Sequence, residues 1–499
     1  MKNITYPTLL LIATILLSSC EDKASEQVEE STISYEFDEP HRPQYHFSPP
    51  EQWMNDPNGM VYLDGEYHLF YQHYPDSNVW GPMHWGHAIS TDMIHWEHLP
   101  IALYPDSLGY IFSGSAVIDH GNTSGLGTNG IDPMIAIYTY HHQEDPQSQG
   151  IAFSNDKGRS WTKYDKNPVL KSPGIPDFRD PKVSWYEDAD GNGKWIMTLA
   201  VKDRISFYSS PNLIDWKHES DFQPDWAAYG GVWECPDLFT LKTTGGEEKW
   251  VLLVSINPGG PNGGSATQYF IGDFDGGQFS AEGEKVKWID YGTDNYAGVT
   301  WSNIPENDGR RLFLGWMSNW QYANIVPTTE WRSAMTLPRS LELISIADED
   351  YLASRPVAEI SNLLSQNATS NENPILLENP LAEIKLKASD AGNKSIVLSN
   401  KEGESLLISM DMEQLKIDRS KAGKVDFSEV FSAIQHAPLE GLKVEEVTLY
   451  LDRSSIEIFI NDGEMVMTTI FFPSSSFNSV EHTGFVQKAE IAYFQSIWK

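Results

Sequence analysis

The sequence predicts an all-β protein in which a five-bladed β-propeller precedes a β-sandwich, and three observations carry this prediction. From residue 53 to about 340, short apolar runs alternate with Gly, Asn and Asp, and hardly any 3.6-residue periodicity is present. Two sequence markers recur there about every 60 residues. After about residue 345, Trp becomes rare and alternating stretches such as EIKLKAS and SIVLSN appear. We therefore expect a propeller at 39–345 and a sandwich at 346–499.

The N-terminus, MKNITYPTLLLIATILLSSC, predicts a leader. Its apolar run from Leu9 to Leu17 is too short to span a bilayer, and the layout is typical of a secretory signal. The ending LSSC resembles the lipobox of bacterial lipoproteins, which implies cleavage before Cys20 and acylation of its thiol. A plain secretory signal with an incidental cysteine is the alternative. We expect a signal peptide at 1–20, a flexible acidic linker at 21–38, and export to the bacterial cell envelope, with membrane contact only through a lipid on Cys20.

The first marker of the repeat is a unit of strand, glycine turn and second strand. MVYLDGEYHLFYQ comes after Asp56, PKVSWYEDADGNGKWIMTLAV follows Asp180, and CPDLFTLKTTGGEEKWVLLVSI follows Glu234. Two further units lack the leading carboxylate and begin at Ser113 and Ala297. Five units of this length, each with room for four strands, indicate the five blades of a propeller.

The second marker keeps the same period. It ends at an aromatic residue in STDMIHW, SNDKGRSW, SPNLIDW and GDFDGGQF, at Trp96, Trp161, Trp216 and Phe279. A sandwich with coincidental spacing is the alternative. In a propeller the first strands of all blades surround one axis, so Asp56, Asp180 and Glu234 are expected to converge.

The stretch WMNDPNG sets the local geometry of Asp56. Pro57 fixes its own φ and disfavours the helical region for Asp56, while Asn58 and Gly59 favour left-handed turn geometry. We therefore expect Asp56 at the end of a strand.

The C-terminal half reads as successive strands. EVTLYLDRSSIEIFINDGEMVMTTIFFP contains a hairpin turn at Asn461, Asp462 and Gly463. It shows no cluster of carboxylates, His or Cys, so structural support is the expected role and sugar binding is the alternative.

Composition restricts the partners. The formal net charge of −35 repels nucleic-acid phosphates and anionic membranes, so we expect no nucleic-acid partner and a neutral substrate. Only Cys235 follows Cys20, which excludes a disulfide framework. Six His residues between positions 68 and 98 match no metal-ligand spacing. We expect no metal and no cofactor, and the sequence does not indicate an oligomeric state.

Three acids in an aromatic-lined pocket suit the cleavage of glycosidic bonds. One carboxyl group protonates the leaving oxygen, and an ionised one attacks the anomeric carbon or activates water. A third stabilises the positive charge that develops on the sugar ring. Each acid also has a structural reading, as a turn cap for Asp56, a partner of Arg179 for Asp180, and a packing carboxylate for Glu234.

Seven motifs make a resemblance specific. In order they are WMNDPNG, YHLFYQHYP, WGPMHWGHAISTDMIHWEHLPIAL, FSGSAV, FRDPKV, WECPDLF and GWMSNW. They resemble glycoside hydrolase family 32, the β-fructosidases that include invertases, inulinases and levanases, and DRSSIEIFINDGE resembles that family's C-terminal sandwich.

The resemblance implies a retaining double displacement. Asp56 corresponds to the nucleophile, Glu234 to the general acid and base, and Asp180 to the stabiliser of the transition state. The positions that it implies for holding the fructosyl unit are Asn55, Gln72, Trp80, Ser113, Arg179 and Trp316.

Within that family the sequence is closer to exo-acting levanases and inulinases than to intracellular sucrose hydrolases, notably in IFSGSAVID and NTSGLG. The expected partner is therefore a fructan or fructo-oligosaccharide, with hydrolysis from the terminal fructose. The alternatives are endo action, a preference for sucrose, a propeller hydrolase of pentose polymers, and a non-catalytic sugar-binding propeller.

Overall fold

The computed structural model describes residues 36–499 apart from 143–145, 348, 391, 440 and 499. The expected signal peptide, Cys20 and most of the expected linker lie outside the described residues. The described part is built from strands, with two short 3-10 helices, η1 (Ala323–Ile325) and η2 (Ala358–Leu363). Within it, no helix is long and apolar enough to cross a membrane.

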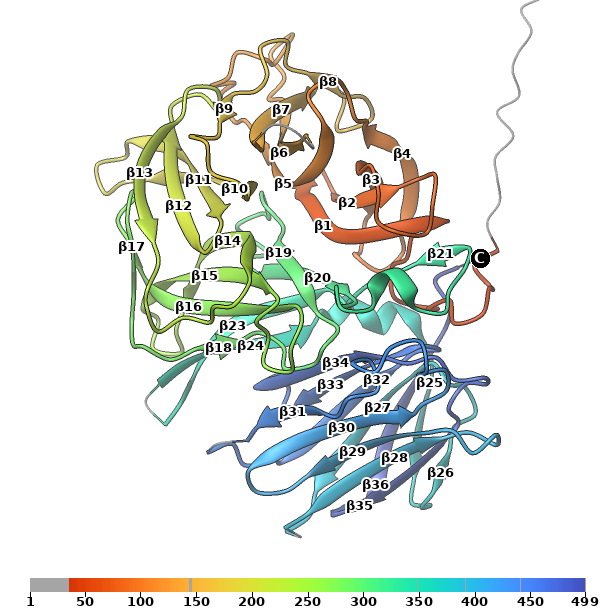
Figure 1. The fold of residues 1–499 in the computed structure, drawn as a ribbon. Helices are drawn as coiled ribbons and strands as arrows, with labels where there is room; N and C mark the ends of the chain where they lie inside the picture. Colours follow the sequence, from red (N-terminus) through yellow and green to blue (C-terminus); the bar gives the residue numbers. More distant parts are fainter. Residues whose placement is uncertain (1–35, 143–145, 348, 391, 440, 499) are drawn as a thin grey trace, which may run out of the picture. The chain divides into compact units, whose positions relative to one another are not determined.

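Five sheets surround one axis, and apart from one parallel strand in the first sheet their strands pair antiparallel (Figure 1). The first blade contains β1 (Gln52–Leu63), β2 (Glu66–Tyr74), β3 (His84–Ser90), β4 (Glu97–Leu103) and the parallel strand β21 (Trp331–Arg332). The second contains β5 (Tyr110–Ile118), β6 (Met134–His141), β7 (Ser148–Ser154), β8 (Thr162–Lys163) and β9 (Leu170–Lys171). The third contains β10 (Phe178–Glu187), β11 (Gly193–Val201), β12 (Arg204–Ser210) and β13 (Lys217–Phe222).

The last two blades complete the ring. The fourth contains β14 (Val232–Lys242), β15 (Glu248–Asn257), β16 (Ala266–Phe274), β17 (Phe279–Ala281) and β18 (Lys287–Trp288). The fifth contains β19 (Tyr296–Thr300), β20 (Arg311–Met317), β22 (Ala334–Met335), β23 (Arg339–Ile346) and β24 (Glu349–Pro356). Because β24 pairs with β23, the sheet of the last blade continues beyond residue 345, the expected end of the propeller.

The prediction of a five-bladed propeller is confirmed, and both markers have a structural meaning. The five starting positions lie in β1, β5, β10, β14 and β19, which are the innermost strands. The aromatic markers stand at the start of the outermost strands: Trp96, Trp161 and Trp216 directly precede β4, β8 and β13, and Phe279 opens β17. Separate apolar clusters fill the junctions between neighbouring blades, which explains why each blade needs its neighbours.

The C-terminal sandwich is also confirmed, as two six-stranded sheets. One sheet contains β25 (Leu364–Ser370), β27 (Ala382–Ala388), β32 (Glu446–Leu451), β33 (Ser455–Ile460), β34 (Met465–Ile470) and β36 (Phe485–Phe494). The other contains β26 (Ile375–Leu376), β28 (Lys394–Ser399), β29 (Ser405–Met410), β30 (Gln414–Lys421), β31 (Gln435–Pro438) and β35 (Ser479–Thr483). The predicted hairpin joins β33 to β34, with positive φ at Asn461, Asp462 and Gly463.

Buried ions join the sandwich to the propeller. Arg339 of β23 pairs with Glu457 of the sandwich at 2.5 Å and with Asp290 at 3.1 Å. His46 lies between Asp452 and Glu457, at 2.8 and 3.0 Å. Burial lowers the pKa of His46, but hydrogen bonds to these two carboxylates raise it to about 9. The junction is therefore a charged network in which every member has a partner.

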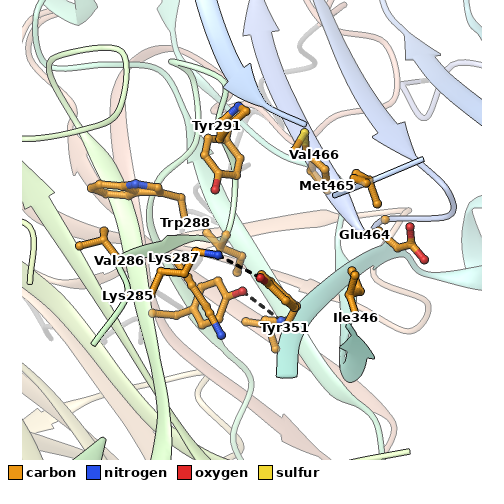
Figure 2. Close-up of a pocket in the computed structure, with 16 residues that line it drawn as sticks. Lys285, Val286, Lys287, Trp288, Tyr291, Ile346, Tyr351, Glu464, Met465 and Val466 are labelled. Atoms are coloured by element: carbon orange, nitrogen blue, oxygen red, sulfur yellow. Dashed lines mark hydrogen bonds between the residues drawn. The ribbon is translucent and has the colours of Figure 1, made fainter. Parts of the chain in front are cut away.

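A small cavity of about 100 Å³ lies at the same junction, where β18 and β24 approach the hairpin after β33 (Figure 2). Lys285 and Lys287 extend toward Tyr351, and the Lys287 ammonium lies 4.4 Å from the centre of its ring. Lys287 also pairs with Glu349 at 2.9 Å. The ammonium groups of the two lysines therefore have their partners within the propeller.

The prediction that Asp56 ends a strand is wrong. β1 runs through WMNDPNG without interruption, from Gln52 to Leu63. The pairing of β1 with β2 shifts register between Met54 and Pro57, so a β-bulge stands where a turn was expected. Pro57 fits there because a bulge interrupts the ladder in which its missing N–H would be needed. Gly59 does adopt positive φ, at 53°, inside the strand.

Candidate active site

The bulge in β1 recurs in every blade. The pairing of each innermost strand with the next strand shifts register close to a dipeptide that ends in Pro or Gly. The five dipeptides are Asp56-Pro57, Ser113-Gly114, Asp180-Pro181, Cys235-Pro236 and Ala297-Gly298. Bulges bend a strand and redirect its side chains. This shared distortion brings together residues that are far apart in the sequence.

The first residues of these dipeptides form a deep row. Asp56 Oδ2 accepts a hydrogen bond from Ser113 Oγ at 2.7 Å, and its Oδ1 accepts one from Asn55 Nδ2 at 2.9 Å. Asp180 Oδ2 accepts a hydrogen bond from the Cys235 backbone N–H at 3.0 Å. The Cys235 thiol lies 3.5 Å from Asp56 Oδ2 and 3.6 Å from Asp180 Oδ2. All of these side chains are buried.

The residues one position earlier form a second row, which contains Arg179, Glu234 and Tyr296. Arg179 donates to Glu234 Oε1 from Nε at 3.2 Å and from Nη2 at 3.0 Å. Tyr296 donates its hydroxyl proton to Glu234 Oε2. Glu234 is therefore not the positional equivalent of Asp56 and Asp180, as the repeat suggested, but stands one residue earlier in its strand.

Both rows open into a cavity of about 300 Å³. It is lined by Asn55, Asp56, Gln72, Trp80, Phe112, Ser113, His141, Gln147, Asp177, Arg179, Asp180, Glu234, Asn257 and Trp320. The structure thus brings together all three expected acids and five of the six residues expected to hold sugar. Trp80 is the exposed member of this group, at 39% of its surface.

Trp316, the sixth expected residue, does not line the cavity. It is fully buried and packs against Trp53, Tyr296 and Trp320, with ring centres 6.3, 6.4 and 4.9 Å away. Trp320, the last residue of the motif GWMSNW, lines the cavity in front of it. Two tryptophans four positions apart cannot be told apart by motif alone.

The pKa values of Asp56 and Asp180 are both raised, and different neighbours oppose the shift at each residue. Burial raises the pKa of Asp56, and the hydrogen bonds from Ser113 and Asn55 partly oppose this. Burial also raises the pKa of Asp180, where the Arg179 charge opposes the shift and the charges of Glu234 and Asp56 add to it. Burial and the Glu234 charge raise the pKa of the Tyr296 hydroxyl well above its usual value, so this hydroxyl stays a donor.

Sequence reasoning missed Tyr296, which holds Glu234, and several side chains that line the cavity. Tyr296 directly precedes Ala297, which the repeat did identify, so comparison of the row before each dipeptide would have found it. Phe112 and His141 stack at 4.2 Å on one wall, and no spacing rule marks that pair. Among the described residues, no group of three or more His, Cys, Asp or Glu side chains is arranged to hold a metal ion.

This arrangement suits displacement at a sugar carbon. Asp56 is oriented by two donors, which leaves a carboxylate of fixed position for attack. Glu234 retains 19% side-chain exposure, so it can exchange protons with solvent while Arg179 and Tyr296 hold it. Asp180 is the third carboxyl group and is buried next to Asp56 and Glu234.

Comparisons with known proteins agree with this chemistry. Residues 46–356 match the profile of the glycosyl hydrolases family 32 N-terminal domain, and residues 354–497 match that of the family 32 C-terminal domain. A levanase of Bacillus subtilis is 48% identical over 467 residues, which cover 89% of this chain and 68% of the levanase. An extracellular exo-inulinase of Aspergillus awamori is 39% identical, over 89% of this chain and 92% of its own length.

Solved structures agree as well. The crystal structure of exo-inulinase from Aspergillus awamori superimposes with a TM-score of 0.84 at 36% identity, covering 93% of this chain and 100% of that one. The β-fructofuranosidase of Schwanniomyces occidentalis, complexed with fructosyl-erythritol, superimposes with a TM-score of 0.82 at 32% identity, covering 94% and 100%. The chain therefore belongs to glycoside hydrolase family 32.

Proposed function

We propose that the protein is an exo-acting β-fructosidase that hydrolyses terminal β-D-fructofuranosyl residues from fructans such as levan and inulin. The observation that carries the proposal is the meeting of Asp56, Asp180 and Glu234 in one cavity of about 300 Å³. The similarity to a levanase and to exo-inulinases supports a fructan as substrate.

In the first step Asp56 attacks the anomeric carbon and the bond to the leaving oxygen breaks. The leaving oxygen takes the electron pair of that bond together with the proton of Glu234. The hydrogen bonds from Ser113 and Asn55 hold Asp56 in place for attack and favour its ionised form. In the second step Glu234 removes a proton from water, whose oxygen bonds to the anomeric carbon and releases Asp56.

Asp180 stabilises the positive charge of the sugar ring in both transition states. The Cys235 N–H and the charge of Arg179 favour its ionised form against the effect of burial. This role needs no proton transfer, which agrees with the deep position of the side chain.

The remaining residues hold the fructosyl unit. Gln72 donates Nε2 to the Ile111 carbonyl at 3.0 Å, which leaves its amide oxygen for a sugar hydroxyl. Asn55, Ser113 and Arg179 offer further polar atoms, and the Trp80 indole offers an apolar face to sugar C–H groups. Trp316 acts indirectly, because its ring supports Trp320.

Export and lipid attachment at Cys20 complete the proposal. The related exo-inulinases are extracellular, and a polymeric substrate must be met outside the cytoplasm. Metabolic labelling of cells with a radioactive fatty acid should label the wild-type chain, and Cys20→Ala should abolish the label. Labelling of Cys20→Ala would disprove attachment at that thiol.

A product time course tests the activity. With levan, inulin and sucrose in parallel, free fructose should be the dominant early product from the fructans. Asp56→Ala and Glu234→Ala should lose at least about 10³-fold in kcat, whereas Asp64→Asn, at an exposed turn, serves as the matched control. Early mixed oligosaccharides would show endo action, activity on sucrose alone would show an invertase, and no fructose from any of the three would refute the proposed function.

A further inference from the structure

A second and larger cavity, of about 440 Å³, lies toward the opposite end of the innermost strands. Its residues follow the catalytic ones along the same strands, as Val117 follows Ser113 in β5 and Trp185 follows Asp180 in β10. At about 3.3 Å per residue, the five steps from Asp180 to Trp185 span roughly 16 Å. Trp185 is therefore too far away to contact the reacting fructosyl unit, although the near wall of the cavity, at Lys182, lies two residues after Asp180.

An exposed indole forms part of its wall. Trp185 exposes 45% of its surface although it belongs to an innermost strand. Its ring lies over Gly193, where an added Cβ would come within 1.8 Å of it, and it meets Trp195 edge-on at 5.0 Å between ring centres. Gly193 and Trp195 support one side of the ring, and 45% of the residue stays exposed where it lines the cavity.

An arginine that makes no hydrogen bond with any described side chain forms another part of the wall of this cavity. Arg311 of β20 lines the cavity, and its guanidinium makes no side-chain hydrogen bond and no ion pair with any described residue. The guanidinium lies over the Phe239 ring, 5.1 Å from the ring centre. A half-buried guanidinium has five N–H donors that need acceptors. Burial lowers the pKa of Arg311 and the nearby Asp237 charge opposes this shift, but Asp237 accepts no hydrogen bond from it.

The other charges in the cavity compensate each other. Lys182 Nζ pairs with Asp237 Oδ2 at 3.2 Å and donates to the Thr300 carbonyl. Asp237 also accepts from the Thr300 N–H, while its Oδ1 has no partner among the described residues. An anion seated near Arg311 would also face this carboxylate and could make no use of the indole. A neutral polyhydroxyl ligand uses both groups without that repulsion.

We propose that this cavity is a second, non-catalytic sugar site that binds a segment of a fructan chain. Trp185 stacks on the C–H face of a sugar ring, and Arg311 donates to its hydroxyl oxygens. The Lys182–Asp237 pair stands in the wall, on the strand segments that lead back to Asp180 and Glu234. The identity of the sugar rests on the proposed function, whereas the existence of the site does not. Its effect is to hold polymer at the enzyme between cleavage events.

Calorimetric titration with the trisaccharide 1-kestose counts the sites. The titration uses Asp56→Ala protein, which leaves the ligand uncleaved. We expect two sites for each chain in this background, and one site after Trp185→Ala or Arg311→Gln is added. Met412→Ala, a change of an 86% exposed side chain in the sandwich, is the matched control and should keep both sites.

Activity separates this site from the catalytic one. In the otherwise wild-type chain, Trp185→Ala and Arg311→Gln should leave kcat/KM for sucrose within about twofold and raise KM for levan severalfold. The proposal would be overturned if Asp56→Ala protein bound 1-kestose at a single site both with and without the second substitution. Binding of inorganic phosphate in place of 1-kestose would overturn it too. If one variant fails to fold, as judged by circular dichroism, the other decides. Failure of the proposed function would give a different result, because the wild-type protein would then hydrolyse none of these substrates.

Discussion

At the scale of single residues, one arginine couples two of the three acids. Arg179 binds Glu234 through two nitrogens, and its Nε lies 3.9 Å from Asp180 Oδ2. It also pairs with Asp177 at 2.5 Å. Its positive charge opposes the effect of burial on Asp180, where the pKa is nevertheless raised. In the proposed mechanism, the arginine thus orients the proton donor Glu234, and its charge favours the ionised form of Asp180 against the effect of burial.

Arg179→Gln should therefore raise the pKa of Asp180 further. Because the proposed mechanism needs Asp180 in its ionised form, the acidic limb of the pH profile of kcat/KM should move to higher pH. We also expect kcat to fall about 10²-fold, since Glu234 loses two donors. The profile should be measured on sucrose, with the exposed Arg159→Gln as control. An acidic limb that does not move would contradict the proposed coupling.

Tyr296→Phe isolates the second partner of Glu234. A hydrogen bond to a charged group contributes about 1.5–3 kcal/mol, so its loss should lower kcat roughly tenfold or more. KM should change little, because the hydroxyl contacts the acid rather than the sugar. Steady-state kinetics on sucrose measures both constants, and a rise in KM with unchanged kcat would assign Tyr296 to substrate binding instead.

At the scale of elements, the bulge in each innermost strand determines where side chains point. The five register shifts explain why acids separated by as many as 178 positions share one cavity. Turn-forming residues in WMNDPNG serve this distortion and do not reverse the chain. Sequence rules favour a turn there because Pro, Asn and Gly are common in turns as well as in bulges.

Gly59→Ala tests the packing beneath the first bulge. An added Cβ would lie 2.7 Å from Phe70 Cδ2 and 2.8 Å from Trp85 Cζ3, at a residue with φ of 53°. We expect a loss of about 2–4 kcal/mol in the free energy of unfolding. Gly65→Ala is the matched control, because its φ is also positive but nothing lies within 4 Å of the added atom. Urea unfolding should show the larger loss for Gly59→Ala, and equal losses would refute a packing effect.

At the scale of the whole protein, the buried ions between propeller and sandwich connect stability to pH. His46 has a raised pKa of about 9, so its contribution is complete below about pH 6.5, its usual pKa. That contribution is lost as pH rises through about 9. Since His46 contacts Asp452 and Glu457, its deprotonation leaves two buried carboxylates with one fewer cation.

We therefore expect the free energy of unfolding to fall by up to about 3 kcal/mol between pH 7 and pH 10. In His46→Gln this part of the pH dependence should be absent, and stability at pH 7 should be lower. Urea unfolding at several pH values provides the measurement. A wild-type profile as flat as that of the variant would contradict the raised pKa.

Much of the fold and of the candidate site could be predicted from the sequence, because a repeat of about 60 residues and seven ordered motifs can be read directly along the chain. The blades and the convergence of Asp56, Asp180 and Glu234 followed from them. The one-residue offset of Glu234, the place of Trp320 in front of Trp316, and the ionic junction around Arg339 depend on register and packing between distant segments. Such contacts leave no spacing pattern along the chain.

The stereochemistry of transfer to methanol tests the central claim most directly. When levan is hydrolysed in aqueous methanol, a fructosyl intermediate on Asp56 is attacked from the face that the leaving sugar occupied. NMR of the early products should show free fructose together with methyl β-D-fructofuranoside, with few oligosaccharides. Methyl α-D-fructofuranoside as the transfer product would show inversion and would contradict the double displacement through Asp56 and Glu234.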